Sequence, residues 1–426
     1  MKISTVLAVG GLLREAFSFW TGHPFDFELW VRLGYYTVRG VSPYGVLPAA
    51  PGLSFADVFS TTSTATIGYL PFWPFVTAAM YALYSLVGFG NRFVYYFLLK
   101  QPEIAGDIAV AYFLYLIVKK ARPEKAVWTA AVWAFLPLSI ILSGIWGMFD
   151  SVAMALVLAA LLSSSASSRS LLSGMAIFAK SVPLIYAIPL TLGRARHWWG
   201  ILVAVLIPAL LTLGISSVMG WSIASVVRVV GSTVGKEGGS MSAFMILSYL
   251  QRTGMITPQA VGQLWALNYI WIPAVIVGTV AAAKAFGLQS DTGVIRVMLV
   301  ATLLFLIFKT QINEQYSIYL LALGLLDVSL IQPRRIKLVA ATAVAAVVYL
   351  LVNNILLLRF AAPAYPQAAV LDQLLDSRYA PYRSTGELLA GLAFTILNVA
   401  YLVWLWRDLS ESRRGHEGER MTLPPD

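Results

Sequence analysis

The stretch WWGILVAVLIPALLTLGISS, residues 198–217, contains no charged side chain. A helix of about 20 apolar residues spans the roughly 30 Å hydrocarbon core of a bilayer. Apolar runs long enough to do this recur along the whole chain, and short polar joints separate them. The sequence therefore predicts a polytopic integral membrane protein of the all-α class.

The composition excludes several classes of protein. Of the 426 residues, 59% are hydrophobic and only 12% are charged, which excludes a water-soluble domain of this size. The absence of cysteine excludes disulfides, thiolate zinc sites, iron–sulfur clusters and a cysteine nucleophile, and the three histidines argue against a histidine-rich metal site. The sequence contains no Walker or dinucleotide-binding loop, so nucleotide chemistry is not expected.

The net charge of +10 is explained by membrane topology. Basic residues gather in joints between apolar runs, and such joints are typical of the cytoplasmic side of a membrane. We therefore expect no nucleic acid partner, and we expect four cytoplasmic joints: Lys119–Lys125, Arg194–His197, Pro333–Lys337 and the tail Arg407–Arg420.

The order of these joints predicts about twelve crossings, with both termini inside. The expected crossings are residues 4–20, 101–118, 126–144, 151–165, two short helices within 171–192 that meet near Lys180–Pro183, and 198–217, 268–287, 295–311, 316–331, 338–357 and 388–406. Residues 67–90 are expected to form an interfacial or re-entrant helix inside an external loop, 21–100. A cleaved signal peptide is the alternative for the first segment, but Arg14 and Glu15 interrupt its apolar core.

Acidic residues near the predicted outer face are the first candidates for chemistry, because burying a carboxylate is costly unless it is paired or used. Asp26 and Glu28 lie two residues apart between aromatic residues and can act as a general base and a partner. Glu103 and Asp107 share one helix face at the expected outer start of the second crossing. The alternatives are a polar loop rim for the first pair and a helix N-terminus for the second.

Asp150 lies in an expected outward turn, where it is either a third acidic site or an ordinary helix cap. Lys180 lies between two apolar half-helices, where a cation either binds an anionic headgroup or extends to the interface. Lys309 begins a second outward-facing polar cluster with the following residues up to Tyr316, and Arg228 lies on a long outer loop, 218–267, against the usual charge bias.

Five segments, in this order, resemble the GT-C glycosyltransferases. They are FDFELWVRLGYYTVRGVSPYG (25–45), KQPEIAGDIAVAYFLYLIVKK (100–120), GIWGMFDSVAMALVLAALL (144–162), GMAIFAKSVPLIYAIPL (174–190) and FKTQINEQYSIYLLALGLL (308–326). More narrowly, the chain is similar to the branch that uses a polyprenyl-phosphate sugar, such as the dolichyl-phosphate-mannose mannosyltransferases, including the first mannosyltransferase of GPI-anchor synthesis. The resemblance covers residues 1–330, and each segment is short and degenerate.

The resemblance implies an external active site that transfers a hexose, with mannose expected, from a polyprenyl-phosphate donor to a lipid or glycan acceptor with inversion. Asp26 matches the family's base. Glu28 stands where an Asp-x-Asp-like motif has its second acid, so a divalent metal is left open and no cofactor is required. The remaining matches are Glu103 or Asp107 for the next acidic position, Asp150 for the Gly-x-x-Asp turn, Lys180 for the hairpin lysine, and Gln315 and Tyr316 for a Gln-Tyr element.

The same residues suit this reaction on chemical grounds. Glycosyl transfer from a phosphate ester needs a base, positive charge or N–H donors on the departing phosphate, and exclusion of water. We therefore expect Asp26 as general base, Glu28, Glu103, Asp107 and Asp150 to position the acceptor or an ion, and Lys180, Arg228, Lys309, Gln315 and Tyr316 to hold the donor phosphate.

On this hypothesis, residues 1–330 form the catalytic module, 331–406 add further membrane helices, and 407–426 form a cytoplasmic tail. The membrane is the plasma membrane in a prokaryote or the endoplasmic reticulum membrane in a eukaryote. The main alternative is a secondary transporter or a flippase of a lipid-linked sugar, in which buried charges mark a translocation path. A structural assembly subunit, the third alternative, leaves the one-sided acidic residues unexplained.

Overall fold

The computed structural model describes residues 2–55, 67–88, 90–193, 198–232 and 241–421. All regular elements in these ranges are helices, which confirms the all-α class. The first half contains α1 (Ile3–Ser18), α2 (Asp26–Thr37), α3 (Phe72–Val87), α4 (Arg92–Ala121), α5 (Pro123–Ala134), α6 (Pro137–Ile140), the π-helix η2 (Ile141–Trp146), α7 (Asp150–Leu162), α8 (Ala166–Ala179), η3 (Val182–Tyr186), α9 (Ala187–Leu192) and α10 (Trp199–Met219).

The second half continues the bundle. It contains α11 (Ile223–Ser232), α12 (Met245–Arg252), α13 (Pro258–Leu264), η4 (Trp265–Tyr269), α14 (Trp271–Phe286), α15 (Asp291–Phe308), η5 (Glu314–Tyr316), α16 (Ser317–Leu330), η6 (Pro333–Arg335), α17 (Ile336–Asn353), η7 (Ile355–Ala361) and α18 (Gln367–Met421).

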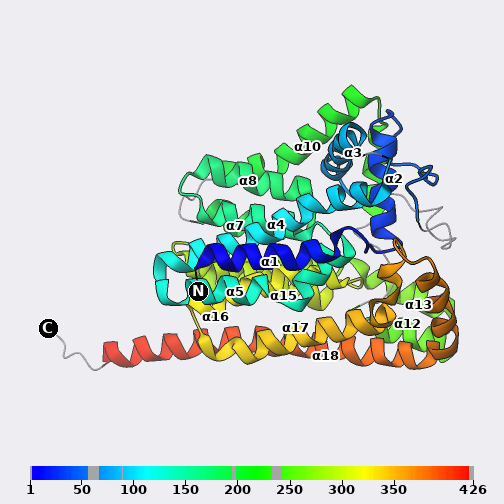
Figure 1. Cartoon of the computed structure of the whole chain (residues 1–426). Coiled ribbons are helices and arrows are strands. Elements are labelled where there is room, and N and C mark those ends of the chain that lie inside the picture. The colour runs from blue at the N-terminus through cyan, green and yellow to red at the C-terminus, as the bar shows by residue number, and fades with distance from the viewer. Residues whose placement is uncertain (1, 56–66, 89, 194–197, 233–240, 422–426) are drawn as a thin grey trace.

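α1, α4, α5, α17 and α18 run roughly side by side, and α2, α12 and α13 lie at one end of them (Figure 1). α4 packs against α1, α5 and α7, while α15 packs against α14, α16 and α18. The start of α1 and the last turns of α18 lie together at the opposite end from α2, α12 and α13 (Figure 1).

Apolar, membrane-length helices are present as predicted. Within the described ranges, five helices are long and apolar enough to cross a membrane: Trp199–Met219, Pro258–Phe286, Asp291–Phe308, Pro333–Asn353 and Val370–Asp408. They coincide with expected crossings, and a sixth is added if the bent pair Pro123–Ala134 and Pro137–Trp146 is one span. The length and apolar character of these helices therefore indicate a membrane protein.

The expected crossing 126–144 is broken in its middle. Pro137 lacks an N–H and its ring displaces the preceding backbone from the helical region, so Leu136 is extended (ψ 119°) and the two halves meet at 50°. The break predicted near Lys180–Pro183 is confirmed, because α8 ends at Ala179 and Lys180 is extended before η3.

Two boundaries differ from those expected. α4 begins at Arg92, so Glu103 and Asp107 lie in the middle of a 30-residue helix and not at its outer start. Its first turn is instead capped by the Asn91 side chain, which accepts a hydrogen bond from the Phe93 N–H. α18 continues to Met421, so residues 407–421 extend the last helix and do not form a separate tail. The joint Arg194–His197 lies outside the described residues.

Candidate functional site

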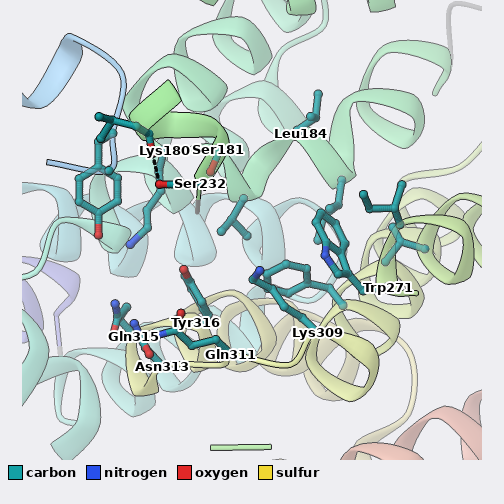
Figure 2. A pocket seen from close by; sticks show the side chains of 18 of the residues that line it. Lys180, Ser181, Leu184, Ser232, Trp271, Lys309, Gln311, Asn313, Gln315 and Tyr316 are labelled. Carbon is teal, nitrogen blue, oxygen red and sulfur yellow. Dashed lines mark hydrogen bonds between the residues drawn. The ribbon is translucent and has the colours of Figure 1, made fainter. Parts of the chain in front are cut away.

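A cavity of about 730 Å³ lies where the two polar clusters of the sequence meet. Its walls come from the start of α2, the break between α8 and η3, α14, the end of α15 and the segment 309–316. Figure 2 shows Lys180 and Ser181 on one side of the cavity and the residues of the 309–316 segment on the other. Segments more than 280 positions apart in the sequence are thus brought together around one space.

The lining is divided by polarity. The polar side chains are Asp26, Tyr69, Lys180, Ser181, Ser232, Thr279, Lys309, Gln311, Asn313, Gln315 and Tyr316. The apolar side chains come chiefly from η3, α9, α14 and α15, and include Leu184, Ile185, Ile188, Ile272, Val275, Ile276 and Phe305. A ligand with one charged end and one hydrocarbon end matches this lining.

Asp26 is the predicted base, and the structure places it on the cavity wall at the first residue of α2. Its side chain is 21% exposed. The indole Nε1–H of Trp146 donates a hydrogen bond to Asp26 Oδ2 at 3.0 Å. The carboxylate is therefore held in place while part of it faces the space where a ligand would lie.

His23 caps the helix that carries Asp26. The N–H of Asp26 donates to His23 Nδ1 at 3.1 Å, so Nδ1 acts as an acceptor and the ring proton belongs on Nε2. Burial, with Arg359 as the next cause, lowers the pKa of His23 well below its ordinary value of 6.5. The imidazole is thus neutral at physiological pH, and its 3.4 Å approach to the Asp26 carboxylate is a contact and not an ion pair.

Lys180 and Asp150 form a buried ion pair, with Nζ and Oδ2 2.5 Å apart. The Lys180 side chain is 1% exposed, which excludes extension to the interface. Its ammonium group also lies 5.0–5.3 Å from the ring centres of Phe149, Tyr69 and Tyr316. Lys180 therefore lines the cavity as half of a neutralised pair, and Asp150 is its counter-ion as well as the first residue of α7.

Tyr69 and Tyr316 supply neutral hydroxyl groups to the cavity. Burial raises the pKa of both phenols, and the carboxylates of Asp26 and Asp150 raise both further. Both side chains stay protonated at any physiological pH. They are available as O–H donors to an anionic ligand without adding negative charge.

The segment from Lys309 to Tyr316 presents alternate side chains to the cavity. Lys309, Gln311, Asn313, Gln315 and Tyr316 line it (Figure 2). The Lys309 Nζ lies 5.3 Å from the Trp271 ring centre, and Gln315 Oε1 is buried with no hydrogen-bond partner among the described residues. This segment therefore offers one cation and several amide groups to a polar ligand.

Five predicted site residues do not line the cavity: Asp150, which contacts it only through Lys180, and four others. Glu28 is fully buried, accepts from Arg32 at 2.7 Å and from the Phe55 N–H at 3.0 Å, and burial raises its pKa against the opposing effect of Arg32. Glu103 is buried in α4 behind Phe27 and Gly147, and neither of its carboxylate oxygens has a hydrogen-bond partner among the described residues. Arg228 lies on the exposed face of α11.

Asp107, the fourth, belongs to a buried network. It pairs with Arg14 at 2.6 Å and accepts from Ser143, Ser151 and the Trp133 indole. Arg14 links the same carboxylate to the backbone of α1 and α5. Asp107 therefore holds α1, α4, α5 and the π-helix together and does not face the cavity.

In the described ranges, no group of three or more histidine and acidic side chains converges. Asp26 and Glu28 do not converge either, because Arg32 and the Phe55 N–H take the Glu28 carboxylate. Asp26 and Glu28 therefore do not share a metal site here, and the need for a divalent metal is left open.

Sequence reasoning missed Trp146, Tyr69 and Trp271. Trp146 lies within the quoted GIWGMFD segment, but only folding shows that its indole reaches Asp26, 120 positions earlier. Tyr69 and Trp271 belong to apolar, aromatic-rich stretches in which nothing distinguishes a cavity residue from a packing residue.

The chain matches no protein-family model and no curated protein. The resemblance to GT-C glycosyltransferases therefore stays a hypothesis carried by the residues themselves.

We predict that Arg14→Met lowers the free energy of unfolding by about 3–5 kcal/mol, because it leaves the buried Asp107 carboxylate without its cation. Thermal unfolding in detergent measures this. The double variant Arg14→Met/Asp107→Asn should recover most of the loss, and Arg378→Met, on the exposed part of α18, is the control. If Arg14→Met unfolds at the same midpoint as the wild type, Asp107 does not have the structural role assigned to it.

We also predict that the protein loses stability as the pH falls below about 6.5, because unfolded His23 takes up a proton there and folded His23 does not. The stabilisation that comes from the neutral His23 side chain is fully present above this pH. In His23→Asn, the amide oxygen can still cap α2 but does not titrate, so the loss should be smaller. The measurement is the thermal midpoint in detergent as a function of pH, with His416→Asn as control; equal pH dependence of both variants would contradict the prediction.

Proposed function

We propose that this protein is an inverting glycosyltransferase that moves a hexose, with mannose as the expected sugar, from a polyprenyl-phosphate donor to a hydroxyl of a lipid or glycan acceptor. The observation that carries the proposal is the cavity in which Asp26 and Lys309 share a polar end with the Lys180–Asp150 pair, while η3, α9, α14 and α15 provide an apolar end. A sugar linked through phosphate to a hydrocarbon chain has the same two ends.

The reaction is a single displacement. The oxygen of the acceptor hydroxyl attacks the anomeric carbon, its proton passes to the Asp26 carboxylate, and the bond from the anomeric carbon to the phosphate oxygen breaks. Polyprenyl phosphate leaves with the bonding electrons, and the configuration at the anomeric carbon is inverted. Asp26 suits the role of base because it lies on the wall and is held by Trp146.

Lys309 lines the cavity and brings a positive charge to the side where the phosphate would depart. Because the charge of Lys180 is balanced by Asp150, the Lys180–Asp150 pair orders the cavity and contributes little net attraction for an anion. The protonated phenols of Tyr69 and Tyr316 and the amide groups of Gln311, Asn313 and Gln315 add hydrogen-bond donors. Donors and charges of this kind stabilise the negative charge that develops on the leaving group.

The apolar end suits the hydrocarbon chain of the donor. Leu184 on η3 and Ile276 on α14 line the cavity and are nevertheless 50% and 52% exposed, so the cavity reaches the outer surface of the bundle between these elements. A lipid chain can enter there from the bilayer while its head group occupies the polar end.

The proposal includes the topology expected above: a GT-C-like fold of about twelve crossings with both termini in the cytoplasm and the cavity at the external face. The bent pair Pro123–Ala134 and Pro137–Trp146 would add a sixth crossing to the five long apolar helices. The other six would be α1, α4, α7, α16 and the two short helices on either side of Lys180, which are shorter or more charged. The membrane would be the plasma membrane of a prokaryote or the endoplasmic reticulum membrane of a eukaryote.

A transporter or flippase of a lipid-linked sugar would use the same cavity. The helix break at Lys180 favours this alternative, because transporters often build their sites from broken helices. The two functions differ in the need for a base, which transport does not use.

We predict that purified protein transfers radiolabelled mannose from polyprenyl-phosphate-mannose to at least one acceptor in a panel of lipids and glycans. Asp26→Asn should bind the donor with unchanged affinity and reduce the transfer rate by about 10²–10⁴-fold, because the amide cannot accept the proton. Asp291→Asn, at the far end of α15 from the cavity, is the matched control. Donor binding without transfer by the wild type would favour the flippase, and an active Asp26→Asn enzyme would remove Asp26 as the base.

We further predict that Lys309→Met weakens donor binding by roughly tenfold, the loss expected for one charge-assisted hydrogen bond, and that Lys309→Arg retains most of the affinity. Arg228→Met removes an equal charge outside the cavity and should leave donor affinity unchanged. Binding of polyprenyl-phosphate-mannose to the protein in detergent measures both. Equal losses from the two methionine variants would mean that the effect is one of overall charge.

A further inference from the structure

We propose that Trp146 is the positioning residue of Asp26, fixing the orientation of the carboxylate and favouring its ionised form through the indole N–H. The catalytic meaning of this inference rests on the function proposed above, whereas the contact itself can be tested independently of it. Trp146 is 4% exposed and does not line the cavity, so it acts on a substrate only through Asp26.

The donor and acceptor geometry supports this role. The Trp146 Nε1 lies 3.0 Å from Asp26 Oδ2, within the normal range for a hydrogen bond to a carboxylate. An indole N–H can only donate, so it favours the ionised form of the carboxyl group over the protonated form. A base has to be ionised to accept a proton, and Trp146 therefore supports that state.

The indole is clamped between other rings. The His23 imidazole stacks on it at 4.5 Å with an interplanar angle of 14°, and Phe360 of η7 lies 5.4 Å from the indole and 5.2 Å from the imidazole. Phe360 is itself held, because its carbonyl accepts a hydrogen bond from the Gly22 N–H at 2.9 Å. The donor thus has little freedom to turn away from Asp26.

The backbone that carries Trp146 is fixed by a buried lysine. Trp146 is the last residue of the π-helix, whose final carbonyls cannot all be satisfied within the helix. The Lys100 ammonium donates to the carbonyls of Gly144 and Ile145 at 2.8 and 3.1 Å, and to the carbonyl of Thr21 at 2.8 Å. One side chain thereby ties the Trp146 segment to the connection that leads to Asp26.

The residue after Trp146 has a conformation that requires glycine. Gly147 has a φ of 87°, and a Cβ built there would lie 2.6 Å from the Phe27 ring. The Gly147 carbonyl accepts a hydrogen bond from the Trp30 indole at 2.9 Å. The chain therefore turns sharply here, which separates the indole of Trp146 from the first turn of α7.

Other ionisable groups also lie around Asp26, and they affect the charge state of its carboxyl group together with Trp146. From the other elements around the cavity these are Tyr69, Tyr316, Glu314, Lys309 and the Lys180–Asp150 pair, and on its own side His23. Lys180 balances the charge of Asp150, and His23 is neutral. The indole N–H of Trp146 adds a direct hydrogen bond to these surroundings and favours the ionised Asp26 carboxylate.

The first experiment tests the contact without requiring catalysis. In protein labelled with ¹⁵N at its 13 tryptophan indoles, the N–H resonances are followed as a function of pH in detergent. We expect one indole resonance to titrate in the wild type, to lose that titration in Asp26→Asn and to be missing in Trp146→Phe. If every indole resonance behaves the same in the wild type and in Asp26→Asn, the inference is overturned.

The second experiment tests the consequence for the base, using transfer from polyprenyl-phosphate-mannose. Trp146→Phe keeps a ring between His23 and Phe360 but removes the donor, so the acid limb of the pH–rate profile should move upward by about one pH unit, with an unchanged KM for the donor. Trp133→Phe is the matched control, because the Trp133 indole donates to Asp107, outside the cavity.

Trp133→Phe should reduce stability without moving the profile. A profile of Trp146→Phe identical to that of the wild type would overturn the inference. An indole resonance that depends on Asp26, in a protein that transfers no sugar, supports the inference and counts against the proposed function alone.

Discussion

The constraint on which this structure depends is that charges inside an apolar bundle have to be paired. An uncompensated ion in such an interior costs several kcal/mol, whereas a paired and hydrogen-bonded one is tolerated. Four buried ion pairs in the described residues meet this need: Arg14–Asp107, Arg32–Glu28, Lys180–Asp150 and Arg335–Asp327, whereas the buried Glu103 carboxyl group has no ion pair among these residues. Three of these pairs join different elements, Arg32–Glu28 lies within α2, and Asp26 is set apart from all of them by its partial exposure and its neutral donor.

The cavity exists because helices are interrupted next to it. α8 stops at Ala179, so Lys180 turns inward, and the π-helix stops at Trp146, so the indole reaches Asp26. Uninterrupted helices would satisfy their own backbone groups and present only side chains of one face. Here the free backbone groups are satisfied by side chains such as Lys100, and the interruptions become the walls of a site.

The lengths of the apolar segments and the positions of local helix breaks could be predicted from the sequence. The partners of ion pairs between distant residues could not. The break at Lys180 follows from Pro183 and from the shortness of the segment, and the structure has it. The pairing of Glu28 with Arg32 was also accessible, because residues four apart on a helix are neighbours. Asp107 pairs with a residue 93 positions away, and no local pattern indicates which distant cation a buried carboxylate will meet.

The same limit explains the position of Asp107 and Glu103. Their spacing correctly placed both on one helix face, but a shared face does not say whether it points to a cavity or to other helices. Both residues were expected near the start of a helix. Because α4 begins at Arg92, they lie in its middle, where α1, α5 and α7 pack against the helix. Helix ends are set by caps such as Asn91, which hydropathy does not reveal.

The opening of the cavity between η3 and α14, beside Leu184 and Ile276, has a consequence for how such a protein meets its ligand. A molecule that enters from the side travels in two dimensions and never passes through water. Its supply is then set by its mole fraction among the surrounding lipids and not by its bulk concentration. Diluting the bilayer with inert lipid would slow encounter even though the total amounts of protein and ligand stay the same, so membrane composition itself would regulate occupancy of the site.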